Sequence, residues 1–164
     1  MVNERGRVGP VARALGYAGL LPQAAAVALL GLKRFSSDDP WDELGGLALV
    51  ITVTYPLLIL SFLGGMWWGL AMQGDRMQGR LATIAILPSL VAFGIAVFVS
   101  LTWAFDRAFV ATGVAVISTL LVDWRLVRTS RMPDGWMALR VPLSLVLGLL
   151  SIAAGIILGP DSVP

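Results

Sequence analysis

A long apolar run without formal charge, residues 47–72, limits the possible folds more than any other feature. Crossing the roughly 30 Å hydrocarbon core of a bilayer takes about 20 apolar residues in a helix, so this stretch is long enough to span a membrane. Ser61, Gly65 and Gly69 recur every fourth residue and would form one stripe without bulky side chains on such a helix. Pro56 removes one backbone hydrogen bond and favours a bend. The stretch therefore predicts a membrane-spanning helix with one bare face.

The composition extends this interpretation to the whole chain. Of the 164 residues, 57% are hydrophobic and only 13% are charged, whereas a soluble domain carries about 25% charge. Apolar runs separated by short polar links predict an all-α, five-helix antiparallel bundle in one domain, residues 1–164. The expected spans are residues 14–32, 47–72, 81–101, 108–122 and 141–158. The first run is too long for a signal-peptide core, so we expect it to be retained.

The basic residues predict an orientation. Nine of the 12 Lys and Arg residues fall in the N-terminal arm, residues 73–80 and residues 123–140, which lie on one side of a five-span topology. The positive-inside rule then predicts a cytoplasmic N-terminus and a periplasmic C-terminus. Lys33 is the only lysine against 11 arginines, which fits a GC-rich bacterial gene, so we expect a multi-pass protein of the bacterial inner membrane. All six tryptophans, Trp67 and Trp68 included, fall near expected span ends, as interfacial tryptophans do.

The sequence offers little for catalysis. It contains no Cys and no His, and no phosphate-cradling, nucleophile-elbow or zinc-protease motif. We therefore expect a non-enzymatic protein with no catalytic residue, no metal and no cofactor, and no nucleic-acid partner. Prolines break or head several spans, as in transporters, but the middle of every expected span lacks Asp, Glu, Lys and Arg. Because coupled carriers need buried ionisable groups, this disfavours ion or proton transport.

Two sets of small residues are candidates for close contact. The first set, a helix-packing or ligand groove, comprises Ser61, Gly64, Gly65, Trp67, Trp68 and Gly69. The second packing face comprises Ser144, Gly148, Ser151, Gly155 and Gly159. Ordinary packing inside the bundle is one interpretation of such faces. A groove for a lipid or quinone, or a face that docks another membrane subunit, are the alternatives.

A third candidate is a basic cytoplasmic rim. It comprises Arg125, Arg128, Arg131 and Arg140, with Asp123, Trp124 and Trp136 beside them. Contact with anionic lipid headgroups, at about 1 kcal/mol per basic residue, is the simplest role. A docking surface for a partner protein is the alternative.

Four stretches carry a resemblance to a known family: LGYAGLLP (residues 15–22), LSFLGGMWWGLAM (60–72), ILPSL (86–90) and RVPLS (140–144). They resemble a family of small bacterial membrane proteins of unknown function that also includes a mitochondrial inner-membrane protein. The resemblance implies a multi-span helical fold and supplies no reaction. The motif SFLGGxxWG is its most specific part, and at the position of Trp67 the family pattern usually has His or Arg.

These observations favour a protein that works by contact. The leading hypothesis is an accessory or assembly subunit of a larger respiratory or photosynthetic membrane complex, with membrane lipids and other subunits as partners. The alternatives are a lipid- or quinone-binding membrane protein and a small-solute transporter or channel.

Overall fold

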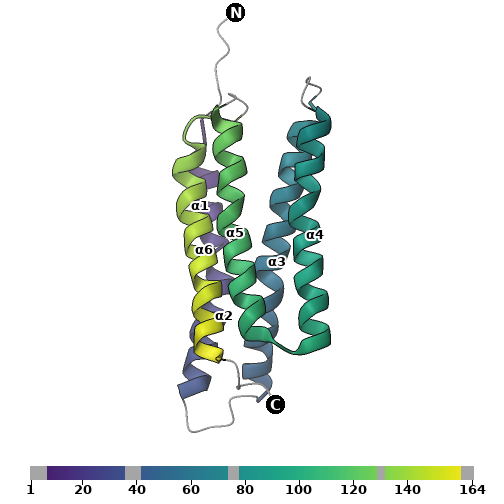
Figure 1. Ribbon diagram of the computed structural model, residues 1–164. Helices are drawn as coiled ribbons and strands as arrows, with labels where there is room; N and C mark the ends of the chain where they lie inside the picture. Colours follow the sequence, from purple (N-terminus) through teal and green to yellow (C-terminus); the bar gives the residue numbers. More distant parts are fainter. Residues whose placement is uncertain (1–6, 36–41, 74–77, 129–131, 160–164) are drawn as a thin grey trace, which may run out of the picture.

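The computed structural model describes residues 7–35, 42–73, 78–128 and 132–159, which form the six α-helices of a long bundle (Figure 1). They are α1 (Pro10–Ala18), α2 (Leu21–Phe35), α3 (Glu43–Ala71), α4 (Gln78–Thr102), α5 (Phe105–Arg128) and α6 (Trp136–Leu158). In the described part of the chain, five helical segments are long and apolar enough to cross a membrane, with α1 and α2 together forming the first. The predicted all-α fold with five apolar spans is confirmed.

The first crossing is broken, although we expected one continuous helix. Pro22, at the second position of α2, has no N–H to bond the carbonyl of Ala18, where α1 ends. The turn at Gly19 leaves a carbonyl to which the hydroxyl of Tyr55 on α3 donates a hydrogen bond. A side chain from α3 therefore supports the break.

The remaining helices run further than the expected spans. α5 continues to Arg128 and α6 begins at Trp136, so two stretches assigned to a connection are helical. The link between α4 and α5 is reduced to Trp103 and Ala104. Trp103 adopts a left-handed conformation there, with φ of 56°, which turns the chain sharply. The predicted spans were too short because a charged residue was taken to mark the end of a span.

Helices α3, α5 and α6 form the middle of the bundle, with α4 beside α3 and α5 on one side and α1 and α2 beside α3 and α6 on the other (Figure 1). Two glycines of the second packing face meet α5 at very short range, whereas Gly159 follows the end of α6 and its Cβ would meet no side chain or other helix of the described residues within 4 Å. A Cβ built on Gly148 would lie 2.8 Å from the carbonyl oxygen of Gly113, and one on Gly155 would lie 2.6 Å from that of Asp106. Glycine is needed at these positions because the two backbones nearly touch.

The first set of small residues divides into two groups. Gly64 packs against the carbonyl of Ala85 on α4, so closely that a Cβ would overlap it. Gly65 and Gly69 are exposed, and no atom of the described residues lies within 4 Å of where their Cβ atoms would be. The interpretation of Gly65 and Gly69 as packed inside the bundle is therefore wrong, whereas Ser61 is partly buried. Gly64 makes the close contact, and Gly65 and Gly69 face outward.

Candidate functional site

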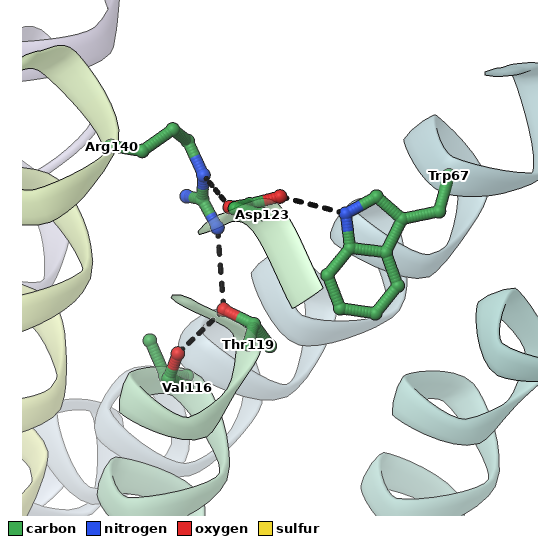
Figure 2. Close-up of polar contacts among 5 residues, drawn as sticks. All are labelled: Trp67, Val116, Thr119, Asp123 and Arg140. Carbon is green, nitrogen blue, oxygen red and sulfur yellow. Dashed lines mark hydrogen bonds and ion pairs between the residues drawn. The ribbon is translucent and has the colours of Figure 1, made fainter. Parts of the chain in front are cut away.

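A buried ion pair links α5 to α6 near one end of the bundle (Figure 2). The Nε of Arg140 donates to Asp123 Oδ2 at 2.7 Å. The Nη2 of Arg140 donates to the Thr119 hydroxyl, with 3.3 Å between Nη2 and Oγ1. The indole Nε1 of Trp67 on α3 donates to the other carboxylate oxygen at 2.8 Å. We call these four residues the polar brace. Because one carboxylate is bonded from α3 and α6, the brace fixes three helices relative to one another.

The brace overturns the placement of Arg140 on an exposed rim. Arg140 is 7% exposed and Asp123 is fully buried, and both lie inside helices rather than in a connection. Arg125 and Arg128 are exposed as expected, with the Arg128 guanidinium 3.8 Å from the centre of the Trp124 ring. Arg131 lies outside the described residues. The structure therefore separates Arg140 from the exposed arginines.

Trp67 also differs from its expected position at the membrane interface. It is 2% exposed, whereas the adjacent Trp68 is 43% exposed and points outward. The indole N–H of Trp67 is directed at the carboxylate of Asp123.

Beside the brace lies an apolar groove of about 290 Å³, which we call the α1/α3/α6 groove. It is lined by Leu15, Gly16, Gly19 and Leu20 from α1 and the following turn, Ile59, Phe62, Leu63 and Met66 from α3, Val116 from α5, and Trp136, Leu139, Arg140, Leu143, Ser144 and Leu147 from α6. Its volume is at the lower end of the roughly 300–1,000 Å³ of small-molecule sites, and such sites are mostly apolar with a few placed polar groups.

The polar side chains of the groove all come from one face of α6, as Trp136, Arg140 and Ser144 are spaced by four residues. The indole nitrogen of Trp136 and the hydroxyl oxygen of Ser144 are buried and have no hydrogen-bond partner among the described residues. Buried polar groups are nearly always bonded, and hydrocarbon offers them no water. Two of the residues that line the groove therefore carry a buried polar atom without a hydrogen bond in the described part of the chain.

A second buried polar cluster, which we call the amide cluster, lies between α2, α3 and α6. Gln23 is fully buried, and its Nε2 lies 3.5 Å from both the Thr52 carbonyl oxygen and the Ser151 hydroxyl. Pro56 explains the first contact, because a proline cannot bond the carbonyl four residues earlier, which is that of Thr52. Gln23 Oε1 and the Thr52 hydroxyl have no partner in the described part of the chain.

Sequence reasoning missed Asp123, Thr119 and the amide cluster as interior groups. Asp123 and Arg140 were noticed, but each fell just outside an expected span. Their opposite charges at the facing ends of two adjacent spans were the available signal. Gln23 gave a weaker signal, because its amide side chain directly follows Pro22 within an apolar run.

Fold and site together define a polytopic α-helical membrane protein with a buried ion pair beside an apolar groove. The chain belongs to the family described as protein of unknown function (DUF3429), which matches residues 8–157. The resemblance drawn from the SFLGGxxWG stretch is thus confirmed at the level of the family. No curated protein and no solved structure matches the chain. Over residues 7–35, 42–73, 78–128 and 132–159, no group of three or more His, Cys, Asp or Glu side chains could hold a metal ion.

Proposed function

We propose that this protein binds an amphipathic small molecule of the membrane, a lipid or a quinone, in the α1/α3/α6 groove. One observation carries the proposal: an apolar groove of about 290 Å³ whose lining includes the polar residues Trp136, Arg140 and Ser144 along one face of α6. Small-molecule sites are mostly apolar with a few placed polar groups, and this lining has that composition.

The wall formed by α1 supports this function. None of the nine residues of α1 is buried against the described part of the chain, and α1 packs mainly on α6. The break at Gly19 separates α1 from α2, which contributes Val27 and Leu30 to the core. A wall that is a separate and largely unburied helix offers a route by which a molecule in the bilayer can enter the groove sideways.

The test is to fill the groove. Leu143 lines it, while Leu145 on the same helix is 38% exposed and lies on another face. Native mass spectrometry of the protein extracted from its membrane should detect a bound small molecule in the wild type and in Leu145→Trp. We expect Leu143→Trp to lose it at least tenfold. Equal retention by both variants, or no bound molecule in the wild type, would contradict the proposal.

A second candidate function is contact with another membrane subunit, which the sequence favoured. The outward-facing Gly65 and Gly69 support it, because a bare helix face permits close helix approach in lipid. Gly65→Leu should then shift the native complex to smaller size on a native gel. Gly94→Leu on the exposed face of α4 is the matched control, since its Cβ also meets no described atom. An unchanged complex in Gly65→Leu would remove this candidate.

We further propose that the membrane is the bacterial inner membrane and that the end of the bundle where α1 begins is cytoplasmic. The excess of Lys and Arg near that end supports the orientation. Because the chain has no cysteine, single Gln78→Cys and Trp103→Cys variants report on opposite ends of α4. A membrane-impermeant thiol reagent should label only Trp103→Cys from the periplasm, and the reverse pattern would refute the orientation.

A further inference from the structure

We propose that the α1/α3/α6 groove holds an acyl chain of an anionic phospholipid, whose phosphate lies at the end of the groove beside Arg13. This inference rests on the proposed function and adds the class of ligand. It depends on the position of Arg13 relative to the groove, on the charges at that end of the bundle and on the apolar length of the groove.

Arg13 lies at the end of the groove where α1 and α6 begin. On α1 it precedes Gly16, which lines the groove, by three residues, so both lie on one face of the helix. The Nη2 of Arg13 lies 3.4 Å from where a Cβ on Gly135 would be, and Gly135 immediately precedes Trp136 of the lining. The Arg13 side chain is exposed and is not itself part of the lining. Its guanidinium is therefore placed to meet a headgroup whose tail occupies the groove.

The charge of Arg13 is not balanced by the described residues. Two acidic side chains of the described chain lie at this end of the bundle, Asp123 and Asp134. Asp123 is buried and already bonded within the polar brace. Asp134 is exposed, forms no ion pair within the described chain, and is paired through its backbone with Arg7. Two arginines, Arg7 and Arg13, against one exposed aspartate leave an excess of one positive charge here, which an anionic headgroup would neutralise.

Two helices also direct their N-termini at this end (Figure 1). α1 begins at Pro10 and α6 at Trp136, and neither has an acidic residue in its first turn or a side-chain hydrogen bond from its N-cap residue. The N-terminal end of a helix carries a partial positive charge and favours anions. These termini add to the attraction that Arg13 exerts on a phosphate.

The lining of the groove suits a hydrocarbon chain. Trp136 and Leu147 both line it and lie eleven residues apart on α6, which is about 16 Å along a helix. Leu20 and Ile59 extend the apolar lining toward the middle of the bundle. The volume of about 290 Å³ is at the lower end of small-molecule sites, so the groove accommodates part of one chain and leaves the second chain of a phospholipid in the bilayer.

Three lipids with identical tails test the inference: dioleoylphosphatidylglycerol, dioleoylphosphatidylcholine and dioleoylglycerol. Only the first carries a net negative charge. Binding to the purified protein in an uncharged detergent is measured by native mass spectrometry. We expect the anionic lipid to bind about fivefold more tightly than the other two, which is the usual effect of one basic residue near a membrane surface.

Arg13→Gln removes the charge and should abolish this preference. Arg125→Gln is the matched control, because it removes the same charge from an exposed position on α5 at the same end of the bundle, outside the groove. It should leave the preference unchanged. Equal effects of the two substitutions would overturn the inference, since they would show a general attraction to basic side chains.

The remaining outcomes separate the inference from the proposed function. Equal binding of the three lipids, or tighter binding of dioleoylglycerol or of decyl-benzoquinone, would overturn the inference. If Leu143→Trp loses all three lipids while Arg13→Gln keeps the wild-type preference, the groove binds a ligand but the assignment of the headgroup is wrong. If Leu143→Trp binds every probe as the wild type does, the proposed function itself fails. Thermal unfolding of each variant verifies that a loss of binding is not a loss of fold.

Discussion

The polar brace and the amide cluster are both buried inside an apolar bundle, yet they meet their hydrogen-bonding needs differently. In the brace, every bond to the Asp123 carboxylate is 2.7–2.8 Å long, and none of its buried polar atoms lacks a partner among the described residues. In the amide cluster, both contacts of Gln23 Nε2 are 3.5 Å long, and two oxygens lack a described partner.

The difference follows from charge. An unpaired ion in a low-dielectric interior costs far more than an unpaired amide, so the ion pair has to be complete whereas the amide cluster tolerates loose bonds. The amide cluster instead meets a local need, the carbonyl that Pro56 leaves without its helical partner. The brace fixes helices together, and the amide cluster compensates for a proline.

Breaking the brace should have the largest effect. Asp123→Ala leaves the Arg140 guanidinium buried without its carboxylate, and we expect a loss of about 3–5 kcal/mol in the free energy of unfolding. Unfolding by SDS in mixed micelles measures it. The double variant Asp123→Leu/Arg140→Met removes both charges and should recover most of the loss. A single variant as stable as the wild type would show that the pair is not needed.

Removing one donor from the brace should lower the free energy of unfolding by less than removing the Asp123 carboxylate. Trp67→Phe deletes the indole hydrogen bond to Asp123 and should lower the free energy of unfolding by about 1.5–3 kcal/mol, the usual contribution of a bond to a charged group. The same SDS titration applies. Trp68→Phe, on the adjacent exposed residue, is the control and should change little. Equal effects of the two substitutions would contradict the assigned role of Trp67.

A substitution in the amide cluster should lower the free energy of unfolding by less than one in the brace. Gln23→Leu removes two 3.5 Å contacts, and side-chain hydrogen bonds between membrane helices average about 0.6 kcal/mol. We expect a loss of that size by the same measurement. A loss as large as that of Asp123→Ala would show that the two clusters do not differ in the way their geometry indicates.

The partly buried ion pair between Lys33 and Asp42, at the other end of the bundle, should contribute least. The Lys33 side chain, and then the backbone amide of Gly45, hold the pKa of Asp42 below its ordinary value. The stabilisation is therefore present above the unfolded-state pKa and disappears as the pH falls through the lower folded-state pKa. Melting temperatures in detergent should show Asp42→Asn slightly less stable than the wild type at pH 7, with the gap closing toward pH 3. A gap that widens on acidification would contradict this sign.

The number of crossings could be predicted because it depends on the local density of apolar residues. The positions of span ends were less accurate, since a charged residue was taken to mark water. Asp123 and Arg140 show why that assumption fails, as two opposite charges 17 residues apart cancel once α5 and α6 pack together. Pairing permits both helices to continue through residues that are unsuitable for lipid when taken alone.

The sequence also could not predict the direction in which the small residues face. Gly64 and Gly65 are neighbours of the same type, but Gly64 contacts α4 while Gly65 faces outward. Periodicity identified a stripe without indicating whether another helix covers it, because the rotation of a helix is set by its neighbours. For the same reason, Trp67 is buried while the adjacent Trp68 is exposed.

The sequence by itself therefore determined that this chain is a five-span helical bundle, since burying apolar residues in lipid and bonding every backbone amide allows little else. The tertiary structure decided which polar groups the bundle encloses. It paired Asp123 with Arg140, directed Trp67 inward and opened a groove beside Trp136 and Ser144. Those outcomes depend on how side chains from different helices meet in space, and no local pattern of residues specifies them.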